Sequence, residues 1–436
     1  MDNKFTIVLF GGSGDLARKK LFPAFVYLVK NGILGKGLTL IGISRKEFSD
    51  EKYKEFLLEN ISEEDKKNSE DLNVKYLSLD INKEGSFEKL KSFVEEIENG
   101  NSRNRLFYLS TGFNFFERIV KGVNRVRLNN NYSKIIFEKP YGEDLKSAIG
   151  LDKIVNECFN EENFFRIDHY LGKYAVQKII PLKIENENFE SLLNNKFVEK
   201  VEIISDENNE IGNRIDFYNK TGAIKDMIQS HLLQVLSLVL MNVKKNMNEE
   251  EIHGEKVNIL KKIKLMKIEN SLLGQYESYK KELEEKNISN SNIETFAKIG
   301  LSCDNERWKG VKIFLRTGKK LNRKYFEIRI FLKTGDSIVL QISPEKKIKL
   351  LFGKEGKEKF KEILYLNGKN LANENNNDYG SLIGEAILGR HNYFPSSEEI
   401  MECWRIVDEI EKVRDKIRFV RYKDFEEPED KKDLID

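Results

Sequence analysis

Short apolar segments alternate with helix-like segments along the first third of the chain. A helix-like stretch at Leu16–Val29 lies between the apolar segments Phe5–Phe10 and Leu38–Ile43. The candidate strands are Phe5–Phe10, Leu38–Ile43, Val74–Leu79, Arg105–Leu109 and Lys134–Phe137. Strands that alternate with helices form β-α-β units, whose strands run parallel in one sheet. The pattern therefore predicts an α/β domain built on a parallel sheet.

The pattern changes after Lys173. Phe326, Ile328 and Ile330 alternate with charged residues, as expected for an antiparallel sheet with one solvated face. The longer elements that we expect here are strands at Val198–Ser205, Val311–Arg316, Tyr325–Lys333 and Ser337–Ser343 and helices at Gly222–Met241 and Ser397–Lys416. We therefore predict a first domain at residues 1–173 and a larger α+β domain with a mostly antiparallel sheet at residues 174–436. The stretches Lys244–Glu251, with its run of charges, and Lys280–Asn292 are expected to be loops or solvated insertions. Phe425–Asp436 is expected to be a mobile acidic tail.

Composition excludes several classes of partner. The 436 residues carry 74 Lys and Arg against 72 Asp and Glu, so no overall charge favours nucleic acid or an anionic membrane. Cys158, Cys303 and Cys403 are isolated, which fits a reducing compartment and gives no metal-ligand spacing. No apolar run reaches the roughly 18 residues that a membrane span needs, and no signal-peptide pattern opens the sequence. We expect a soluble cytoplasmic protein without a metal.

A glycine-rich segment follows the first candidate strand and opens a helix. It reads Gly11-Gly12-Ser13-Gly14-Asp15-Leu16-Ala17. Glycines in this position allow the backbone to turn sharply and approach a pyrophosphate, which the helix N-terminus stabilises. The strict G-x-G-x-x-G spacing is absent, so a plain turn is the alternative. Its place at the first strand of a β-α-β series favours a Rossmann-like dinucleotide-binding domain.

Two basic residues follow the second candidate strand, in Ser44-Arg45-Lys46. NAD-binding proteins usually carry an acidic residue there for the ribose hydroxyls, whereas a basic residue accommodates the 2′-phosphate of NADP. Arg45 therefore indicates NADP, the alternative being a solvated pair of basic side chains.

The segment Arg166–Lys173 concentrates polar chemistry in a few positions. Asp168, His169, Tyr170 and Lys173 follow the apolar pair Phe164-Phe165 and precede a helix-like segment. Free N–H groups at a helix start, together with the basic side chains of His169 and Lys173, suit an anionic ligand. An ordinary polar surface turn is the alternative.

Together these segments resemble the glucose-6-phosphate dehydrogenase family over most of the chain. Three motifs of the first domain match: G-x-x-G-D-L-A at Gly11–Ala17, E-K-P-[FY]-G at Glu138–Gly142 and R-I-D-H-Y-L-G-K at Arg166–Lys173. Three later motifs follow in the family's order: D-x-[MI]-Q-N-H-x-x-Q at Asp226–Gln234, with Ser230 for Asn, R-W-x-G-V at Arg307–Val311 and R-x-G-K at Arg316–Lys319. Each is short, but six in order make coincidence very improbable.

The resemblance implies NADP-dependent oxidation of glucose 6-phosphate to 6-phosphogluconolactone, the first step of the oxidative pentose phosphate pathway. His231 would be the general base that takes the proton of the C1 hydroxyl, a role that suits a group titrating near neutrality. Asp168 would orient the imidazole. Without the resemblance, the apolar surroundings of His231 favour a structural core histidine. The family also implies a homodimer, or a tetramer.

The resemblance assigns further residues by position. The sugar phosphate would be bound by His169, Tyr170 and Lys173, and Lys139 would lie between cofactor and substrate. The sugar would also be contacted by Glu207, Asp226, Lys319 and Arg323. Cofactor contacts would come from Gly11, Gly12, Ser13, Gly14, Asp15, Leu16, Arg45 and Lys139. On an α-helix Asp226 and His231 would differ in direction by roughly 140°, so we expect them to flank a ligand.

The chain departs from the family after Phe107-Tyr108-Leu109. The family usually continues with Pro-Pro-x-x-Tyr, whereas this chain has Ser110-Thr111-Gly112-Phe113-Asn114. Ser343 also replaces a substrate-side Gln, and Tyr174 a common Glu. Two alternative functions stay open: a dehydrogenase of another aldose or sugar phosphate, and an inactive paralogue that senses sugar phosphate.

Overall fold

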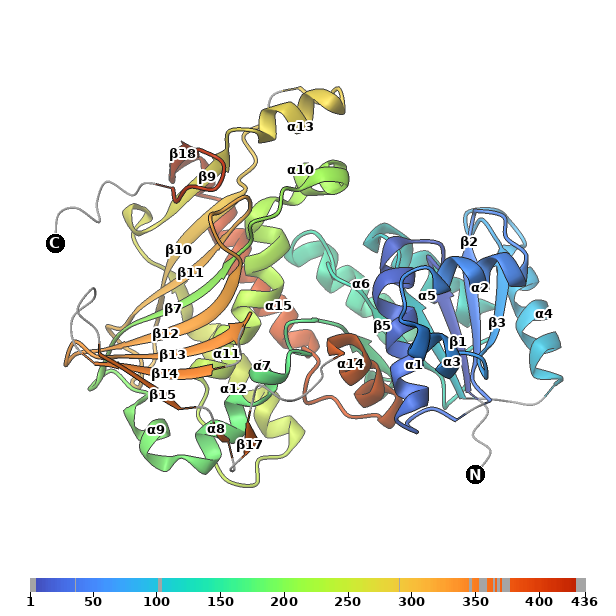
Figure 1. Cartoon of the computed structure of the whole chain (residues 1–436), viewed down its shortest axis with the longest axis horizontal. Helices are drawn as coiled ribbons and strands as arrows, with labels where there is room; N and C mark the ends of the chain where they lie inside the picture. The colour runs from blue at the N-terminus through green and yellow to red at the C-terminus, as the bar shows by residue number, and fades with distance from the viewer. Residues whose placement is uncertain are drawn as a thin grey trace. The chain divides into compact units, whose positions relative to one another are not determined.

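The computed structural model describes residues 5–35, 37–100, 104–289, 291–344, 347–352, 359–363, 365–366, 369–370 and 377–428. The chain divides into two compact units. Unit 1 comprises Met1–Gly172 and Asn376–Ser397, and unit 2 comprises Lys173–Asn375 and Glu398–Asp436 (Figure 1). Residues 429–436 of the predicted tail lie outside the described residues. In the described part of the chain, no helix is both long and apolar enough to cross a membrane.

Unit 1 is built on a six-stranded sheet in the order β3-β2-β1-β4-β5-β6. The strands are β1 (Phe5–Phe10), β2 (Thr39–Ser44), β3 (Asn73–Ser78), β4 (Asn104–Leu109), β5 (Lys134–Phe137) and β6 (Phe164–Arg166). Every pairing is parallel. This is the strand order of a dinucleotide-binding fold, so the predicted Rossmann-like sheet is confirmed.

Helices connect these strands and carry the apolar faces that cover them. They are α1 (Phe22–Lys30), α2 (Asp50–Leu58), α3 (Glu63–Asn68), α4 (Ser86–Glu98), α5 (Phe116–Arg125) and α6 (Leu145–Cys158). A π-helical turn, η1 (Ala17–Leu21), precedes α1. Ser49 caps α2 by accepting the Lys52 N–H, and Asp144 caps α6 by accepting the Ser147 N–H, so polar side chains set where these helices begin.

Helix α14 (Asp378–Leu388) returns to unit 1 from far along the chain. Its buried Leu382 and Ile383 belong to the same apolar core as Phe25 and Leu28 of α1. Lys134 adds two hydrogen bonds from its ammonium to the carbonyls of Ala386 and Ile387, at 2.9 and 2.7 Å. The predicted boundary, which assigned all of 174–436 to the second domain, therefore differs from the structure at residues 376–397. The apolar face of α14 completes the core beside α1, and position along the sequence does not reveal that partner.

Unit 2 is built on a ten-stranded mixed sheet in the order β15-β14-β13-β12-β7-β11-β10-β9-β18, with β8 paired to β10. Its strands are β7 (Val198–Asp206), β8 (Ile263–Leu265), β9 (Leu272–Tyr276), β10 (Phe296–Cys303), β11 (Lys312–Gly318), β12 (Tyr325–Leu332), β13 (Ser337–Ser343), β14 (Lys347–Phe352), β15 (Lys359–Ile363) and β18 (Arg418–Tyr422). Among the described residues of this sheet, only the pairs β7–β11 and β9–β18 are parallel, so the predicted, mostly antiparallel sheet is confirmed.

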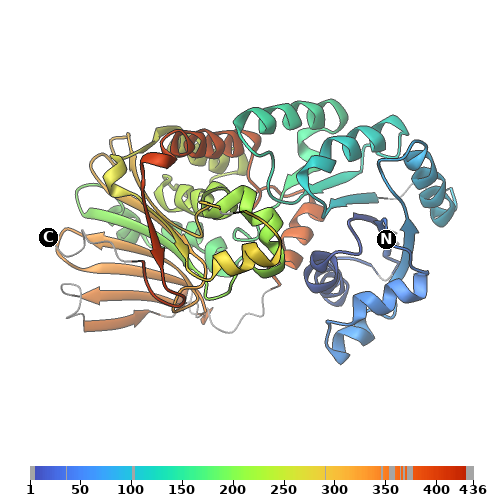
Figure 2. The same cartoon turned by 90° about the horizontal axis from the view of Figure 1, so that it is seen from above.

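Helices α11 (Leu233–Leu240) and α15 (Ser397–Glu411) lie along one face of this sheet (Figures 1 and 2). The predicted helix at Gly222–Met241 has two parts, because a π-helical segment, η5 (Ile224–Leu232), precedes α11. The predicted loop at Lys280–Asn292 is partly wrong, since α13 (Tyr279–Glu285) occupies its start. Tyr279 and Leu283, four residues apart, pack into a buried cluster and stabilise that helix. Likewise, α12 (Glu249–Lys262) begins inside the predicted loop Lys244–Glu251.

Candidate active site

The turn after β1 requires glycine for steric reasons. The N–H groups of Gly11 and Gly12 donate to the Ile43 carbonyl of β2 at 2.9 and 3.0 Å. Gly11 has φ of +81°, and a Cβ there would lie 2.3 Å from the Ser110 carbonyl oxygen. A side chain at Gly11 would therefore both strain the backbone and collide with the segment after β4.

A buried tyrosine fixes the second glycine of this turn. The Tyr53 hydroxyl of α2 donates to the Gly12 carbonyl at 3.1 Å. Its ring fills the space above Gly42, where a Cβ would lie 2.2 Å from Tyr53 Cζ. The turn is thus held from both sides by elements that are far apart in the sequence.

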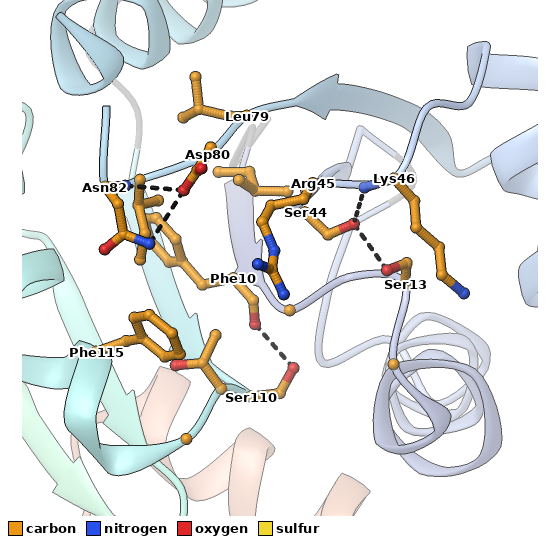
Figure 3. Close-up of a pocket in the computed structure, with 16 residues that line it drawn as sticks. Phe10, Ser13, Ser44, Arg45, Lys46, Leu79, Asp80, Asn82, Ser110 and Phe115 are labelled. Atoms are coloured by element: carbon orange, nitrogen blue, oxygen red, sulfur yellow. Dashed lines mark hydrogen bonds between the residues drawn. The ribbon is translucent and has the colours of Figure 1, made fainter. Parts of the chain in front are cut away.

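A hollow of about 340 Å³ opens at the carboxyl ends of β1, β2, β3 and β4 (Figure 3). It is lined by Phe10, Gly11, Ser13, Gly14, Ile43, Ser44, Arg45, Lys46, Leu79, Asp80, Ile81, Asn82, Ser110, Thr111, Gly112 and Phe115. Of the predicted cofactor residues, Gly11, Ser13, Gly14 and Arg45 line this hollow. Gly12, Leu16 and Lys139 are not among the lining residues, and neither is Asp15, whose carboxylate pairs with Arg18 and Lys19 of its own helix.

Hydroxyl groups organise the basic wall of the hollow. The Ser44 Oγ lies 2.7 Å from both the Ser13 Oγ and the Tyr76 hydroxyl, and it accepts the Lys46 N–H at 3.2 Å (Figure 3). Arg45 projects from this same turn, and no acidic residue occupies the end of β2. The lining is therefore suited to an anionic group near Arg45 and Lys46.

Sequence reasoning assigned no cofactor-binding residue to the parts of the hollow that follow β3 and β4, although it singled out the altered segment after Leu109. Asp80 accepts from the backbone N–H and the side-chain amide of Asn82 at 3.0 and 3.1 Å. Ser110, Thr111 and Phe115 form the wall after β4. Their position just beyond the carboxyl end of a predicted parallel strand was the available signal, since such ends meet at the ligand-binding edge.

Lys139 follows a buried acid at the end of β5. The Glu138 carboxylate accepts the Tyr108 hydroxyl at 2.7 Å, and both side chains are buried. Burial raises the pKa of Glu138 to about 7. The backbone that carries Lys139 is therefore anchored by a hydrogen bond to β4.

The segment Arg166–Gly172 forms a compact polar turn after β6. Buried Asp168 accepts the backbone N–H of Tyr170 at 2.9 Å. The His169 ring stacks against Tyr379 of α14, with ring centroids 6.1 Å apart. The Arg166 guanidinium lies 4.9 Å from the Tyr141 ring and hydrogen-bonds Asp152 and Ser397. The turn is thus held by both parts of unit 1. Lys173 opens unit 2 as the residue before α7 (Tyr174–Gln177).

In unit 2, Asp226 and His231 lie on the π-helical segment η5. A π-helix joins residues five apart by hydrogen bonds, so these two residues share one side of the helix. The expected divergence of roughly 140° is therefore wrong, because it assumed α-helical geometry. Both side chains are buried, and the Asp226 Oδ1 lies 3.4 Å from the Arg214 guanidinium.

Glu207 and Lys319 meet where the parallel strands β7 and β11 end. The register pairs Asp206 with Gly318, so the next residues of both strands are neighbours. The Lys319 ammonium lies 2.8 Å from the Glu207 carboxylate and 6.0 Å from the centre of the Tyr218 ring. Arg323 is exposed in the following loop, and its guanidinium covers the Tyr325 ring at 4.5 Å.

The strand order and the lined hollow of unit 1 define a dinucleotide-binding protein with an attached α+β domain. The family model described as glucose-6-phosphate dehydrogenase, NAD binding domain, matches residues 8–178, and the model of that family's C-terminal domain matches residues 180–436. The chain therefore belongs to the glucose-6-phosphate dehydrogenase family.

Individual relatives agree with this assignment. The chain is 33% identical to glucose-6-phosphate 1-dehydrogenase of Borreliella burgdorferi, with 94% of this chain and 91% of that protein covered. It is 32% identical to the enzyme of the same name from Chlamydia muridarum, covering 94% and 90%. A solved structure of glucose-6-phosphate dehydrogenase in complex with glucose 6-phosphate superposes with a TM-score of 0.86 at 28% identity, covering 99% of this chain and 96% of that chain.

Proposed function

We propose that this protein oxidises glucose 6-phosphate to 6-phosphogluconolactone with NADP, the first step of the oxidative pentose phosphate pathway. The observation that carries the proposal is that the two domain models of one family match both units. Every predicted site residue except Arg323 lies on or next to a helix, a strand end or a turn. The similarity to a structure solved with glucose 6-phosphate supports the choice of substrate.

The residues of the hollow fit a dinucleotide that carries a 2′-phosphate. Glycine at position 11 lets the turn after β1 pack directly against the Ser110 carbonyl at the edge of the hollow. Arg45 and Lys46 supply positive charge where NAD-specific proteins have an acid. A bound NADP would supply the nicotinamide ring as the acceptor of the hydride from the sugar C1. We expect Arg45→Ala to weaken NADP binding at least ~10-fold and NAD binding little, as measured by calorimetry. Arg127→Ala, on the surface away from the hollow, is the control.

In the proposed reaction, the His231 imidazole takes the proton of the C1 hydroxyl as the hydride leaves. Asp168 holds the imidazole in the tautomer that can accept this proton and stabilises the imidazolium that results. His231 is fully buried, so bulk water does not compete for the proton. Asp226 shares its side of η5 and would accept a hydrogen bond from a sugar hydroxyl.

The remaining polar residues would bind the sugar phosphate. A dianionic phosphate is stabilised by several donors with nearby positive charge, which His169, Tyr170 and Lys173 would provide. The paired Glu207 and Lys319 would contact sugar hydroxyls as acceptor and donor, and Arg323 would close over them from its loop. Lys139 would lie between sugar and cofactor.

The decisive test is steady-state kinetics of His231→Asn with glucose 6-phosphate and NADP. We expect kcat to fall at least ~10²-fold with little change in KM, as for the loss of a general base. His253→Asn is the control, because its amide can still donate to Glu399, the partner of His253 at 2.6 Å. Near-normal turnover of His231→Asn would remove that residue from its role.

The same assays separate the alternatives. Glucose and galactose 6-phosphate replace the substrate, and similar rates with free and phosphorylated sugar would refute the phosphate site. The altered segment Ser110–Gly112 motivates the sensor alternative. Binding of NADP and sugar phosphate without NADPH formation would favour that alternative. The homodimer stays a prediction, and sedimentation equilibrium of the purified protein measures it.

A further inference from the structure

The segment after β4 brings hydroxyl groups to the hollow of unit 1. The Ser110 N–H and Oγ both donate to the Phe10 carbonyl, at 3.0 and 2.8 Å, which fastens this segment to the end of β1 (Figure 3). Thr111 and Gly112 come next and line the hollow. The two prolines that the family usually carries here have neither N–H nor O–H groups, so the segment of this chain differs in its capacity to donate hydrogen bonds.

The Thr111 hydroxyl has no hydrogen-bond partner among the residues that the structure describes, although its oxygen is shielded from solvent. The neighbouring Ser110 hydroxyl, by contrast, is satisfied by the Phe10 carbonyl. Burying a hydroxyl without a partner costs free energy that a bound ligand can recover. Rotation about χ1 moves the Thr111 oxygen between staggered positions without displacing the backbone.

The strand order places Thr111 on one particular half of the hollow. In the order β3-β2-β1-β4-β5-β6, the connections reverse between β1 and β4, and a dinucleotide lies across this point with one nucleotide on each side. Arg45 and Lys46 follow β2 and mark the adenosine side. Ser110 and Phe115 lie at the edge of the hollow away from Lys46 (Figure 3). Thr111, next to Ser110, therefore faces the nicotinamide side.

We propose that the Thr111 hydroxyl donates a hydrogen bond to the nicotinamide-nucleotide half of the bound dinucleotide, at its ribose or adjoining phosphate oxygens. The inference rests on the proposed function, because it requires that unit 1 binds NADP. It assigns to Thr111 a binding contribution that the usual prolines of this segment cannot make.

The test compares Thr111→Val, which removes the hydroxyl and keeps the shape, with Thr111→Ser, which keeps the hydroxyl. Calorimetry measures Kd for NADP and for adenosine 2′,5′-bisphosphate, which lacks the nicotinamide half. We expect Thr111→Val to weaken NADP binding about 5- to 10-fold, as for one hydrogen bond, and to leave bisphosphate binding unchanged. Thr111→Ser should bind both ligands like the wild type. The melting temperature of ligand-free Thr111→Val should equal or exceed that of the wild type, because no protein hydrogen bond is lost.

Two results would overturn the inference and leave the proposed function intact: unchanged NADP binding by Thr111→Val, or equal weakening of both ligands. Thr111→Ala removes the same hydroxyl and replaces Thr111→Val if the latter does not fold. If the wild type binds neither ligand, the inference and the proposed function both fail. Wild-type bisphosphate binding without NADP binding would refute both the inference and NADP as the cosubstrate of the proposed function.

Discussion

Glu138→Gln should stabilise unit 1 at alkaline pH and not at acid pH. Burial raises the pKa of Glu138 from 4.5 to about 7 in the folded protein. Between these values the folded state holds a proton that the unfolded state has lost, so the free energy of unfolding falls as pH rises. At about 1.36 kcal/mol per pKa unit, the cost of ionising Glu138 reaches about 3 kcal/mol above pH 7. Glutamine resembles the protonated form and can still accept the Tyr108 hydroxyl.

Urea unfolding at pH 4.5 and pH 8.5, followed by circular dichroism, measures this difference. We expect Glu138→Gln and the wild type to agree within about 1 kcal/mol at pH 4.5, and the variant to be more stable by about 3 kcal/mol at pH 8.5. Tryptophan fluorescence gives a separate readout of unit 2, because Trp308 and Trp404 both lie there. Glu117→Gln, an exposed carboxylate on α5, is the control and should change stability little at either pH.

A stability difference between Glu138→Gln and the wild type that is the same at both pH values would refute this reasoning. It would mean that Glu138 ionises in the folded state as readily as in the unfolded chain. A variant less stable at pH 8.5 would mean that the carboxylate is stabilised by charge rather than penalised by burial.

Two further substitutions test the packing around the site. Gly42→Ala places a Cβ 2.2 Å from the Tyr53 ring, so it should lower the stability of unit 1 by about 1–3 kcal/mol and weaken NADP binding. Gly150→Ala, in open space on α6, should instead raise stability by up to about 1 kcal/mol. Thermal unfolding compares the two variants. Trp308→Phe removes the Nε1–H that donates to the Leu240 carbonyl at 2.8 Å, so it should lower the free energy of unfolding by about 2 kcal/mol, as measured with urea. An unchanged urea midpoint would show that this hydrogen bond does not hold the end of α11.

Elements with a regular hydrophobic pattern were predictable from the sequence. The predicted strands at Phe5–Phe10, Lys134–Phe137 and Ser337–Ser343 match the observed bounds from end to end. In the first two, nearly every side chain is buried, as in a parallel sheet covered on both faces, so an uninterrupted apolar run marks the strand. The fold class followed from these runs and from the order of the helices between them.

The helical geometry around His231 was not predictable in the same way. The polar residues Asp226, Gln229, Ser230 and Gln234 recur at intervals of three and four, the spacing of an ordinary α-helix, so the sequence predicts α-helical turns here. Nothing in this spacing indicates the π-helical turns of Ile224–Leu232. The relative direction of Asp226 and His231 depends on the choice between α- and π-helical turns, and tertiary packing decides it.

Contacts between distant segments were likewise outside the reach of sequence patterns. Tyr108 is the penultimate residue of β4 and Glu138 directly follows β5, so the adjacency of these two strands brings the two side chains to 2.7 Å. The pairing of Glu207 with Lys319 depends in the same way on the parallel register of β7 with β11. The motifs identified these residues, whereas the structure supplies their partners.

The return of α14 to unit 1 has a consequence for synthesis on the ribosome. The core around Phe25 and Leu28 needs Leu382 and Ile383, which are translated more than two hundred residues after Gly172. At roughly 5–20 residues per second, the nascent chain exposes this apolar surface for on the order of ten seconds or longer. We expect chaperones to engage the nascent chain in that interval, and a fragment that stops at Gly172 to aggregate unless residues 376–397 are supplied to it.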